Sequence, residues 1–365
     1  MFENLEAWSV AFADAVWGLP MVALLLGGGA FFLVISRALP YRHLGHGFAV
    51  MSGRYDTPDE QGELSHFQAL AAALSNTMGL GNIGGVALAI VAGGPGAVFW
   101  MWMSAVVGIA TKFFTCSLGV MYRGLDSEGN LQGGPMYVIR EALPKSFYPL
   151  AILFSAAGMI GTLPMFQANQ LTALIGQTVF DGAPPAGAGF VTGLVLAVLV
   201  GVVIFGGLPR VAKVAVRSLP AMVAVYVTMT LYVVLTHITE VPALLWLIVS
   251  EAFNPTAVGG GFIGIMLIGV SRGVFSNEAG VGTEVMAHGA ARTNEPIREA
   301  MVATLGPIFD TLLNSKCTAL VIHLAGDWQS PGASSGITLL GDAVQTQQGI
   351  PGLLAVVSVG LTFCP

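Results

Sequence analysis

Two polar, glycine-rich runs interrupt stretches of the chain that are otherwise apolar. The first, Asn76–Gly85, reads NTMGLGNIGG, and the second, Gly273–Gly282, reads GVFSNEAGVG. Because glycine weakens a helix by about 1 kcal/mol relative to alanine, a regular helix is expected to break at each run. Freed carbonyl groups can coordinate a small cation, and free N–H groups at a helix N-terminus can hold a carboxylate. This combination of groups suits a zwitterionic amino acid bound together with Na⁺.

The composition places both runs in a membrane. Hydrophobic residues make up 55% of the 365-residue chain and charged residues only 9%, with a mean hydropathy of +0.77. Soluble domains carry about 25% charged residues. Apolar segments of about 20 residues, the length that crosses a bilayer, lie near 19–37, 65–91, 98–122, 147–178, 189–207, 218–238, 259–291 and 299–325. The sequence therefore predicts an all-α, multi-pass membrane protein in contact with lipid.

Irregular backbone at membrane depth is tolerated only where protein or a polar cavity surrounds it. A broken membrane helix is typical of a transporter's binding site. Close packing of small residues is the alternative explanation for the glycines. Packing does not explain the polar residues Asn76, Thr77 and Asn82 in the same run. We therefore expect a small polar solute to bind where the two breaks meet.

The order of the segments predicts an internal repeat. If 19–37 is a preceding peripheral helix, the two broken segments are the first and sixth core helices and run in opposite directions. This relationship is typical of a five-plus-five inverted repeat. We expect one transporter domain, with the first repeat at 65–238 and an incomplete second repeat at 259–365.

Basic residues predict the orientation. Of the 14 lysines and arginines, three lie inside apolar segments and the other 11 fall in loops. All 11 lie on the cytoplasmic side if the N-terminus is outside, as the positive-inside rule requires. They are Arg37, Arg42, Arg54, Arg123, Arg140, Lys145, Arg210, Lys213, Arg217, Arg292 and Arg298.

Six charged residues fall within apolar segments: Lys112, Arg272, Glu278, Glu284, Asp310 and Lys316. A charge there costs at least about 2.5 kcal/mol, so each is expected to be paired, neutral or hydrated. Arg272 and Glu278 could form a gate or a structural pair. Glu284 and His288, one helical turn apart, favour a wet cytoplasmic cluster over a proton relay. Asp310 suits an ion path or a tether between helices.

Other classes of protein are disfavoured. Gly79–Gly84 matches the G-x-G-x-x-G pattern of dinucleotide sites, but it lacks the preceding strand and the acidic residue that such sites need. The six histidines are scattered, the three cysteines lack metal-ligand spacing, and neither a G-x-S-x-G nor a Walker motif occurs. A channel would need a selectivity filter, usually a short re-entrant element repeated around an axis, and the sequence shows no such repeat. The sequence thus predicts neither an enzyme nor a nucleotide-driven pump, with no cofactor beyond a coupling ion and no nucleic-acid partner.

Several motifs resemble those of one transporter family. They are Leu80–Gly96 (LGNIGGVALAIVAGGPG), Phe99–Trp102, Thr111–Phe113, Gly133–Tyr137, Gln167–Asn169, Arg272–Gly280 (RGVFSNEAG), His288 and Phe309–Thr311. On these motifs the chain is identified as a member of the alanine/glycine:cation symporter family, the sodium:alanine symporters of the amino acid–polyamine–organocation superfamily. The resemblance implies uptake of alanine or glycine across a prokaryotic inner membrane, coupled to Na⁺ or alternatively to H⁺.

The same resemblance implies which residues form the site. The substrate-binding residues that it implies are Thr77, Gly81 and Asn82 on the first core helix, Gln167 on the third, and Gly273, Phe275, Ser276 and Asn277 on the sixth. Phe275 is expected to act as a lid over a small side chain. The expected Na⁺ ligands are the carbonyl groups of Thr77, Met78 and Gly79 together with the Asn82 side chain.

The family pattern continues beyond Pro365, which falls within the expected eighth core helix. The predicted fold is therefore a broken-helix transporter fold that is preceded by one extra helix and truncated within the eighth core helix. A truncated, transport-inactive member of the family is the alternative to a working symporter. The sequence leaves open the preference for alanine or glycine, the enantiomer, the stoichiometry and the oligomeric state.

Overall fold

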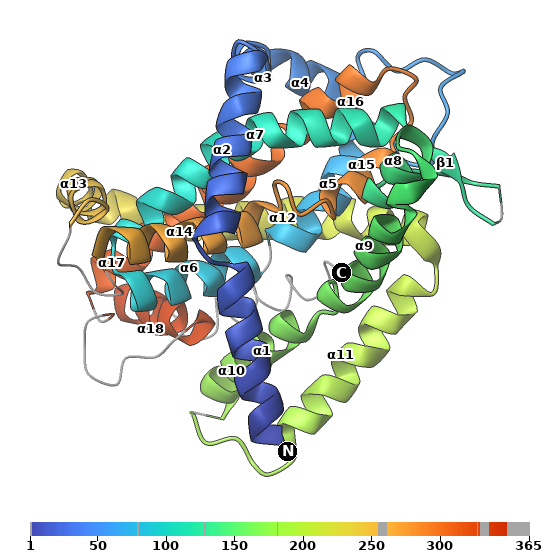
Figure 1. Cartoon of the computed structure of the whole chain (residues 1–365). Helices are drawn as coiled ribbons and strands as arrows, with labels where there is room; N and C mark the ends of the chain where they lie inside the picture. Colours follow the sequence, from blue (N-terminus) through green and yellow to red (C-terminus); the bar gives the residue numbers. More distant parts are fainter. Residues whose placement is uncertain are drawn as a thin grey trace.

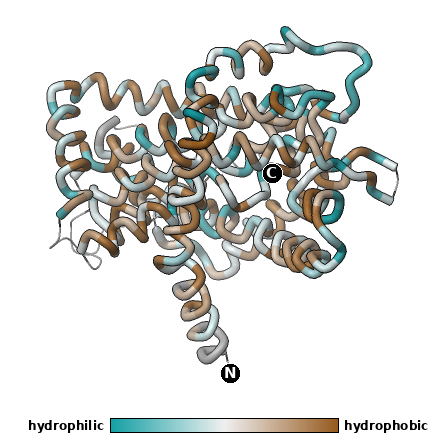
Figure 2. The backbone as a smooth tube through the Cα atoms, turned by 45° about the horizontal axis from the view of Figure 1, so that its top comes forward, coloured by the Kyte–Doolittle hydropathy of each residue, from teal (hydrophilic) through white to brown (hydrophobic). Residues whose placement is uncertain are grey.

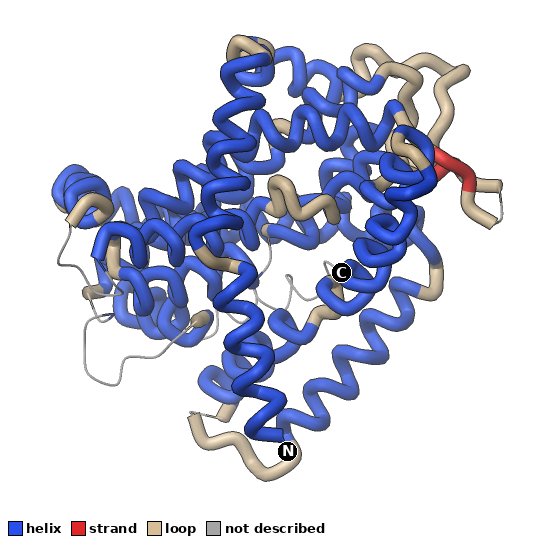
Figure 3. Tube along the Cα trace, in the orientation of Figure 1, coloured by secondary structure: helices blue, strands red, loops and turns tan. Residues whose placement is uncertain are grey.

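The computed structural model describes residues 2–78, 80–127, 129–180, 182–254, 261–326, 328 and 336–348. Most of these residues lie in helices (Figure 3). The strands within these ranges are β1 (Gly124–Leu125) and β2 (Leu131–Gln132), which form a short antiparallel hairpin. Hydrophobic residues follow the helices and hydrophilic residues gather in loops (Figure 2). The expectation of an all-α, multi-pass membrane protein is confirmed.

Four helical spans of the described chain are long and apolar enough to cross a membrane. They are His66–Gly93, Gly96–Met121, Lys145–Val179 and Gly207–Thr236. Shorter apolar helices are Leu19–Ile35, Ala188–Ile204, Val241–Glu251 and Gly261–Asn277. These spans follow the apolar segments of the sequence, except that Val241–Glu251 was not expected as a separate helix.

The N-terminal helices lie on the outside of the core (Figure 1). They are α1 (Phe2–Val16), α2 (Leu19–Ile35), α3 (Leu39–Arg42) and α4 (Leu44–Met51). Helix α2 packs along α7 (Gly96–Met121). A Cβ atom on Gly29 would lie only 2.9 Å from the Cβ atom of Val107, so this glycine permits the close approach of the two helices.

The first core helix is broken, as its sequence predicts. Helix α5 (His66–Thr77) begins with a capping box in which Ser65 and Gln68 bond to each other's backbone N–H groups, an arrangement that satisfies two orphan donors. It ends at Thr77, and α6 (Leu80–Gly93) follows. Helix α6 lies in the interior and contacts α7, α10, α14, α17 and α18. Gly79 lies outside the described residues.

The sixth core helix is also broken, in the second half of the predicted run Gly273–Gly282. Helix α14 (Gly261–Asn277) continues through Gly273, and six residues separate its end from the start of α15 (Glu284–Gly289). The turn between them contains Glu278, Gly280 and Gly282, all with positive φ. Gly273 does not break the helix because the neighbouring turns are held by packing on α7. The break falls instead where three residues with positive φ occur close together.

The expected apolar segment 147–178 is divided at a proline. The elements are η1 (Lys145–Phe147), α9 (Tyr148–Gly161) and α10 (Met165–Val179). Pro164 directly precedes α10, and proline has no N–H group to continue the bonding pattern of α9. Helices α9, α10 and α11 (Ala188–Ile204) form one side of the molecule in Figure 1.

The remaining elements complete the core and its connections. They are α8 (Pro135–Ala142), α12 (Gly207–Thr236), α13 (Val241–Glu251), α16 (Pro296–Ala303), η2 (Ile308–Ser315), α17 (Lys316–Ala325) and α18 (Ile337–Gln348). Element η2 is a π-helix, so the expected segment 299–325 is not one uniform α-helix. Residues 349–365, where the eighth core helix was expected, lie outside the described part of the chain.

Candidate functional site

Asn82 lies at the centre of a buried polar cluster next to the first break. Its side chain is fully buried on α6, and its Nδ2 group donates a hydrogen bond of 3.0 Å to the carbonyl oxygen of Thr77, the last residue of α5. The backbone carbonyl of Asn82 accepts a hydrogen bond of 3.3 Å from Thr318 on α17. Asn82 therefore bridges the break and links the first core helix to the seventh.

Ser276 brings the sixth core helix to the same place. Its hydroxyl group donates a hydrogen bond to Asn82 Oδ1 and lies 3.2 Å from Asp310 Oδ1 and from Thr311 Oγ1. Ser315 Oγ is 3.3 Å from Asn82 Oδ1. The cluster thus gathers side chains from α6, α14 and η2, and the exposed fraction of all five residues is 0%.

Asp310 supplies the only carboxylate among these five residues. Its Oδ1 atom accepts a hydrogen bond from Asn82 Nδ2, while its Oδ2 atom is buried without a hydrogen-bond partner among the described residues. Buried polar atoms are almost always satisfied, so this carboxylate oxygen is available to accept a proton or to bind an ion or a water molecule. A π-helical turn such as η2 is rare and occurs frequently at functional sites.

The donor set of this cluster suits a small hard cation. Carboxylate, carbonyl and amide oxygens are typical ligands of hard cations. The described residues contain no group of three or more His, Cys, Asp or Glu side chains that could hold a metal ion. A single buried negative charge surrounded by neutral oxygens matches one monovalent cation.

Comparison with known proteins identifies the family. Residues 2–364 match the sodium:alanine symporter family. The chain belongs to the sodium:alanine symporter family. This is a family of transporters and not of enzymes.

Three relatives of this symporter family cover most of the chain. An uncharacterised transporter of Haemophilus influenzae is 38% identical over 99% of this chain and 78% of its own length. The sodium/alanine symporter AgcS of Methanococcus maripaludis is 36% identical over 95% of this chain and 77% of its own length. The probable sodium/glutamine symporter GlnT of Bacillus subtilis is 32% identical over 96% of this chain and 72% of its own length.

Two residues that the family resemblance assigns to the substrate face α7 in the structure. A Cβ atom on Gly273 would collide with Ser104 Oγ and would lie 2.9 Å from Met101 Cα. Asn277 donates from Nδ2 to Ser104 Oγ at 3.5 Å and accepts at Oδ1 from the N–H of Ala279 at 2.9 Å. Both residues hold the end of α14 against α7.

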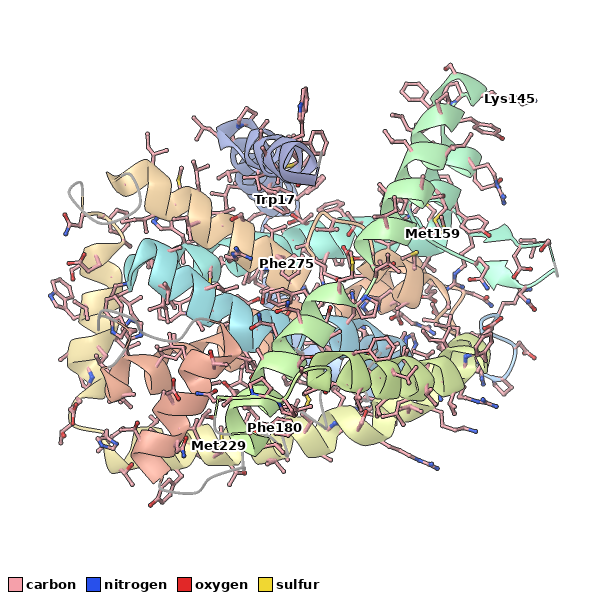
Figure 4. The ribbon with its side chains drawn as sticks, turned by 90° about the horizontal axis from the view of Figure 1, so that it is seen from below. Trp17, Lys145, Met159, Phe180, Met229 and Phe275 are labelled. Atoms are coloured by element: carbon pink, nitrogen blue, oxygen red, sulfur yellow. The ribbon has the colours of Figure 1, made fainter. Side chains whose placement is uncertain are left out.

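Phe275 contacts helix α10, which also carries Gln167. Phe275 is 44% exposed at the end of α14, and its ring meets the ring of Phe166 on α10 edge to face, with centroids 5.8 Å apart (Figure 4). Gln167 follows Phe166 and is half-buried. Two other glutamines of α10 contact α18: Gln170 Oε1 accepts from the N–H of Ile337 at 2.9 Å, and Gln177 Nε2 donates to Asp342 Oδ1.

Thr77 and Gly81 flank the break itself. Thr77 is buried, and its hydroxyl group lies 3.4 Å from the carbonyl oxygen of Leu74 within the same helix. Gly81 lies in the first turn of α6, and Met78 is buried between the two helices. The structure therefore brings Thr77, Asn82 and Ser276 together, and it adds Asp310, Thr311 and Ser315 from the seventh segment.

The charged residues within the apolar segments have other partners than the sequence suggests. Glu278 accepts a hydrogen bond from Asn76 at the first break, and no ion pair joins it to Arg272 among the described residues. Glu284 lies 3.3 Å from the Thr115 hydroxyl group. The expected wet cluster of Glu284 with His288 is not formed, because His288 is completely buried and bonds to Glu299.

Two lysines, Lys112 buried and Lys316 exposed, complete this description. Lys112 on α7 has an exposed fraction of 1%, and it acts electrostatically on Glu278, Glu284 and Asp310. A Cβ atom on Gly306 would lie 3.2 Å from Lys112 Nζ, so this glycine leaves room for the ammonium group. Lys316 Nζ lies 5.7 Å from the ring centroid of Trp102. This cation–π contact is a type of partner that spacing in the sequence does not indicate.

Proposed function

We propose that this symporter-family member takes up a small neutral amino acid, alanine or glycine, together with Na⁺ by alternating access. The observation that supports this proposal most strongly is the buried meeting point of Asn82, Ser276 and Asp310. It joins the first, sixth and seventh core segments next to both breaks. A cation bound there changes the contacts among three segments at once, so cation binding and helix movement are coupled.

The proposed cation site combines the residues expected from the sequence with Asp310. The Thr77 carbonyl group and the Asn82 side chain lie within the hydrogen-bonded cluster, and Met78 and Gly79 are the adjacent positions at the break. Asp310 Oδ2 offers a buried negative charge to the cation. The membrane potential adds about 2.3 kcal/mol per 100 mV for each charge that crosses, which can drive concentrative uptake.

The proposed substrate site lies beside this cluster, next to the first break. The first turn of α6 presents backbone N–H groups without intrahelical partners, which suit the substrate carboxylate. Thr77, Gly81 and Asn82 would line one wall, and Ser276 and Phe275 the other. Gln167 on α10 would complete the third side, while Gly273 and Asn277 would hold the sixth helix in position.

The proposed architecture is the five-plus-five inverted repeat within a single transporter domain. Helix α2 is the peripheral helix 19–37, the first repeat covers 65–238 and the second begins at 259. The 11 loop cations favour an N-terminus outside a prokaryotic inner membrane. Under this orientation α5 begins at the cytoplasmic side, and inward opening requires α5 to move away from α15 and α16.

The direct test is uptake of radiolabelled alanine into proteoliposomes that contain this 365-residue chain. Accumulation that requires an inward Na⁺ gradient is the expected result. If a proton gradient without Na⁺ drives accumulation equally well, the coupling ion is H⁺ and not Na⁺. Absence of uptake of alanine, glycine and glutamine under every gradient would contradict the proposed function of this chain.

Replacing Asn82 with alanine is expected to weaken uptake and sodium activation together. The substitution removes the Oδ1 acceptor and leaves Asp310 and Ser276 without their common partner, and each unsatisfied buried group costs about 1–3 kcal/mol. The measurement is the dependence of initial uptake on sodium concentration. An unchanged sodium concentration for half-maximal uptake would exclude Asn82 from the cation site.

Replacing Phe275 with alanine is expected to admit larger amino acids. The change removes a ring that is 44% exposed and that packs against the ring of Phe166. Since one misfit methylene group in an apolar pocket costs about 1–3 kcal/mol, uptake of valine or leucine relative to alanine should rise about tenfold or more. The matched control is Phe262→Ala, which removes a partly exposed ring near the start of the same helix. Equal substrate profiles for the two variants would contradict a lid.

A further inference from the structure

Three side chains that the proposed mechanism does not use form a buried cluster where α5, α15 and α16 meet. They are His66, His288 and Glu299, with exposed fractions of 1%, 0% and 0%. Glu299 Oε1 lies 2.5 Å from His288 Nδ1, and Glu299 Oε2 is hydrogen-bonded to His66 Nδ1. One carboxylate therefore holds three helix ends together.

This arrangement carries an uncompensated charge when both imidazoles are neutral. A carboxylate accepts hydrogen bonds, so each histidine presents its Nδ1–H group to Glu299 and leaves Nε2 without a proton. Both Nε2 atoms are buried, and neither has a hydrogen-bond partner in the described part of the chain. A buried unpaired charge is costly. One additional proton on either Nε2 atom would turn the cluster into an ion pair.

The two histidines differ in their surroundings. Asp56 Oδ1 lies 3.6 Å from His66 Nε2, and the Asp56 side chain is 45% exposed, so it connects His66 to water. His288 has no carboxylate on its Nε2 side among the described ion pairs. A proton on His66 Nε2 would lie between two carboxylates, and this makes His66 the favoured position.

Other charged side chains near the cluster are engaged in ion pairs or electrostatic contacts of their own. Glu60 also acts on His66, but its carboxylate is paired with Arg298 at 2.8 Å. Arg298 is shared with Glu295 at 3.1 Å. Lys112 on α7 acts electrostatically on Glu284 on α15.

Arg123 is the remaining cation, and backbone groups engage it. Its guanidinium group donates to the carbonyl oxygens of Ala291 at 2.5 Å, Thr293 at 2.9 Å and Gln61 at 3.4 Å. Burial lowers the pKa of Arg123 and the nearby Glu299 carboxylate raises it. Arg123 therefore makes the electrostatic potential at Glu299 less negative, although its hydrogen bonds go to backbone carbonyl groups.

The same helix ends are also joined through the backbone. The N–H group of Leu64 donates to the carbonyl oxygen of Ala290 at 3.1 Å, and the N–H group of Arg292 donates to that of Leu64 at 2.6 Å. These bonds tie the segment before α5 to the segment after α15. Any movement of α5 away from α15 must break them together with the histidine–glutamate contacts.

We propose that His66 binds one exchangeable proton from the cytoplasm and that the protonated cluster holds α5 against α15 and α16. The inference rests on the proposed orientation and on inward opening by movement of α5. Acidification of the cytoplasm then slows inward opening, and alkalinisation releases it. The site thereby makes uptake sensitive to internal pH at a position remote from Asp310.

The test measures initial alanine uptake while the pH on the cytoplasmic face is varied between about 5 and 8, the range in which histidine titrates. Wild-type uptake is expected to fall several-fold as this pH is lowered. In Asp56→Asn the midpoint should move to lower pH, because the exposed carboxylate that attracts the proton is absent. Asp59→Asn makes the same change three residues away on an exposed side chain and should retain the wild-type midpoint. Equal midpoints for these two variants would overturn the proposal.

A second measurement does not depend on transport. The group gains a partner in the folded state, so its stabilising contribution is present at low pH and is lost as the pH rises. The Tm of purified wild-type protein, relative to that of His66→Gln, should therefore be higher at the acid end of the range and converge towards the alkaline end. A constant Tm difference across the range would exclude a proton on His66, even if the chain transports nothing. A folded His66→Gln variant with the wild-type pH profile of uptake would have the same meaning.

Discussion

Asp310→Asn is expected to raise the sodium concentration for half-maximal uptake at least tenfold, or to abolish uptake. The substitution keeps the shape of the side chain and removes its charge. Two unit charges a few ångströms apart attract by about 4 kcal/mol at an effective dielectric constant of about 20. A tenfold change in affinity needs only about 1.4 kcal/mol, so a sizeable effect remains after the cost of desolvating the cation. The measurement is uptake as a function of sodium concentration at fixed potential.

Asp342→Asn is the matched control for this change. Asp342 also accepts a hydrogen bond from a side-chain amide, that of Gln177, but it lies on α18 and away from the break. The control should leave the sodium dependence at its wild-type value. If Asp310→Asn behaves like the control, the unpartnered Oδ2 atom of Asp310 does not bind the coupling ion, and the carboxylate acts as a tether between helices.

Gly273→Ala is expected to cause the second large loss, through packing and not through lost contact with the substrate. The added Cβ atom would collide with Ser104 Oγ and meet the backbone of Met101, which lies on α7. Overpacking of this kind costs about 1–3 kcal/mol, although alanine otherwise favours a helix over glycine by about 1 kcal/mol. The separation of α14 from α7 would displace Ser276 from Asn82. We expect a lower Tm together with a several-fold loss of uptake.

Gly158→Ala is the matched control, and its expected effect on stability is opposite in sign to that of Gly273→Ala. Gly158 lies within α9, and a Cβ atom there would have no other atom within 4 Å. This variant should retain uptake and gain a little stability from its higher helix propensity. A Gly273→Ala protein that matches Gly158→Ala in Tm but loses alanine binding would show that Gly273 lines the substrate pocket, as the family resemblance implies.

The two breaks were predictable because their cause is local. Glycines and polar side chains within an apolar segment are visible in the sequence, and the first break falls where they predict it. The second begins at Glu278, inside the predicted run Gly273–Gly282. Gly273 itself stays helical, and a glycine that packs against a neighbouring helix is indistinguishable in sequence from one that bends the chain. Pro164 divides the third core segment. This proline is also a local signal, but the segment predicts one helix because it is apolar over its whole length.

The partners of the charged residues were not predictable, because they come from distant segments. Spacing suggested Glu284 as the partner of His288, one turn away, but tertiary packing places Glu299 there. Asp310 could be selected as a charge at depth, and its contact with Asn82 depends on how α6 and η2 pack. The substrate-binding and cation-binding assignments remain predictions until transport is measured.

The π-helical turn η2 fixes the angular phase between the two ends of the seventh segment. An α-helix advances by about 100° per residue, and a π-helical turn accommodates about one residue more than an α-helical turn. A helical wheel that treats residues 296–325 as one α-helix would therefore place Glu299 and Thr318 at the wrong relative angle. With the π-helical phase, Asp310 contacts Asn82 and Thr318 contacts Tyr226 on α12. A single-residue deletion in η2 would accordingly turn one of these contacts away from its partner, a change that no substitution on either side can reproduce.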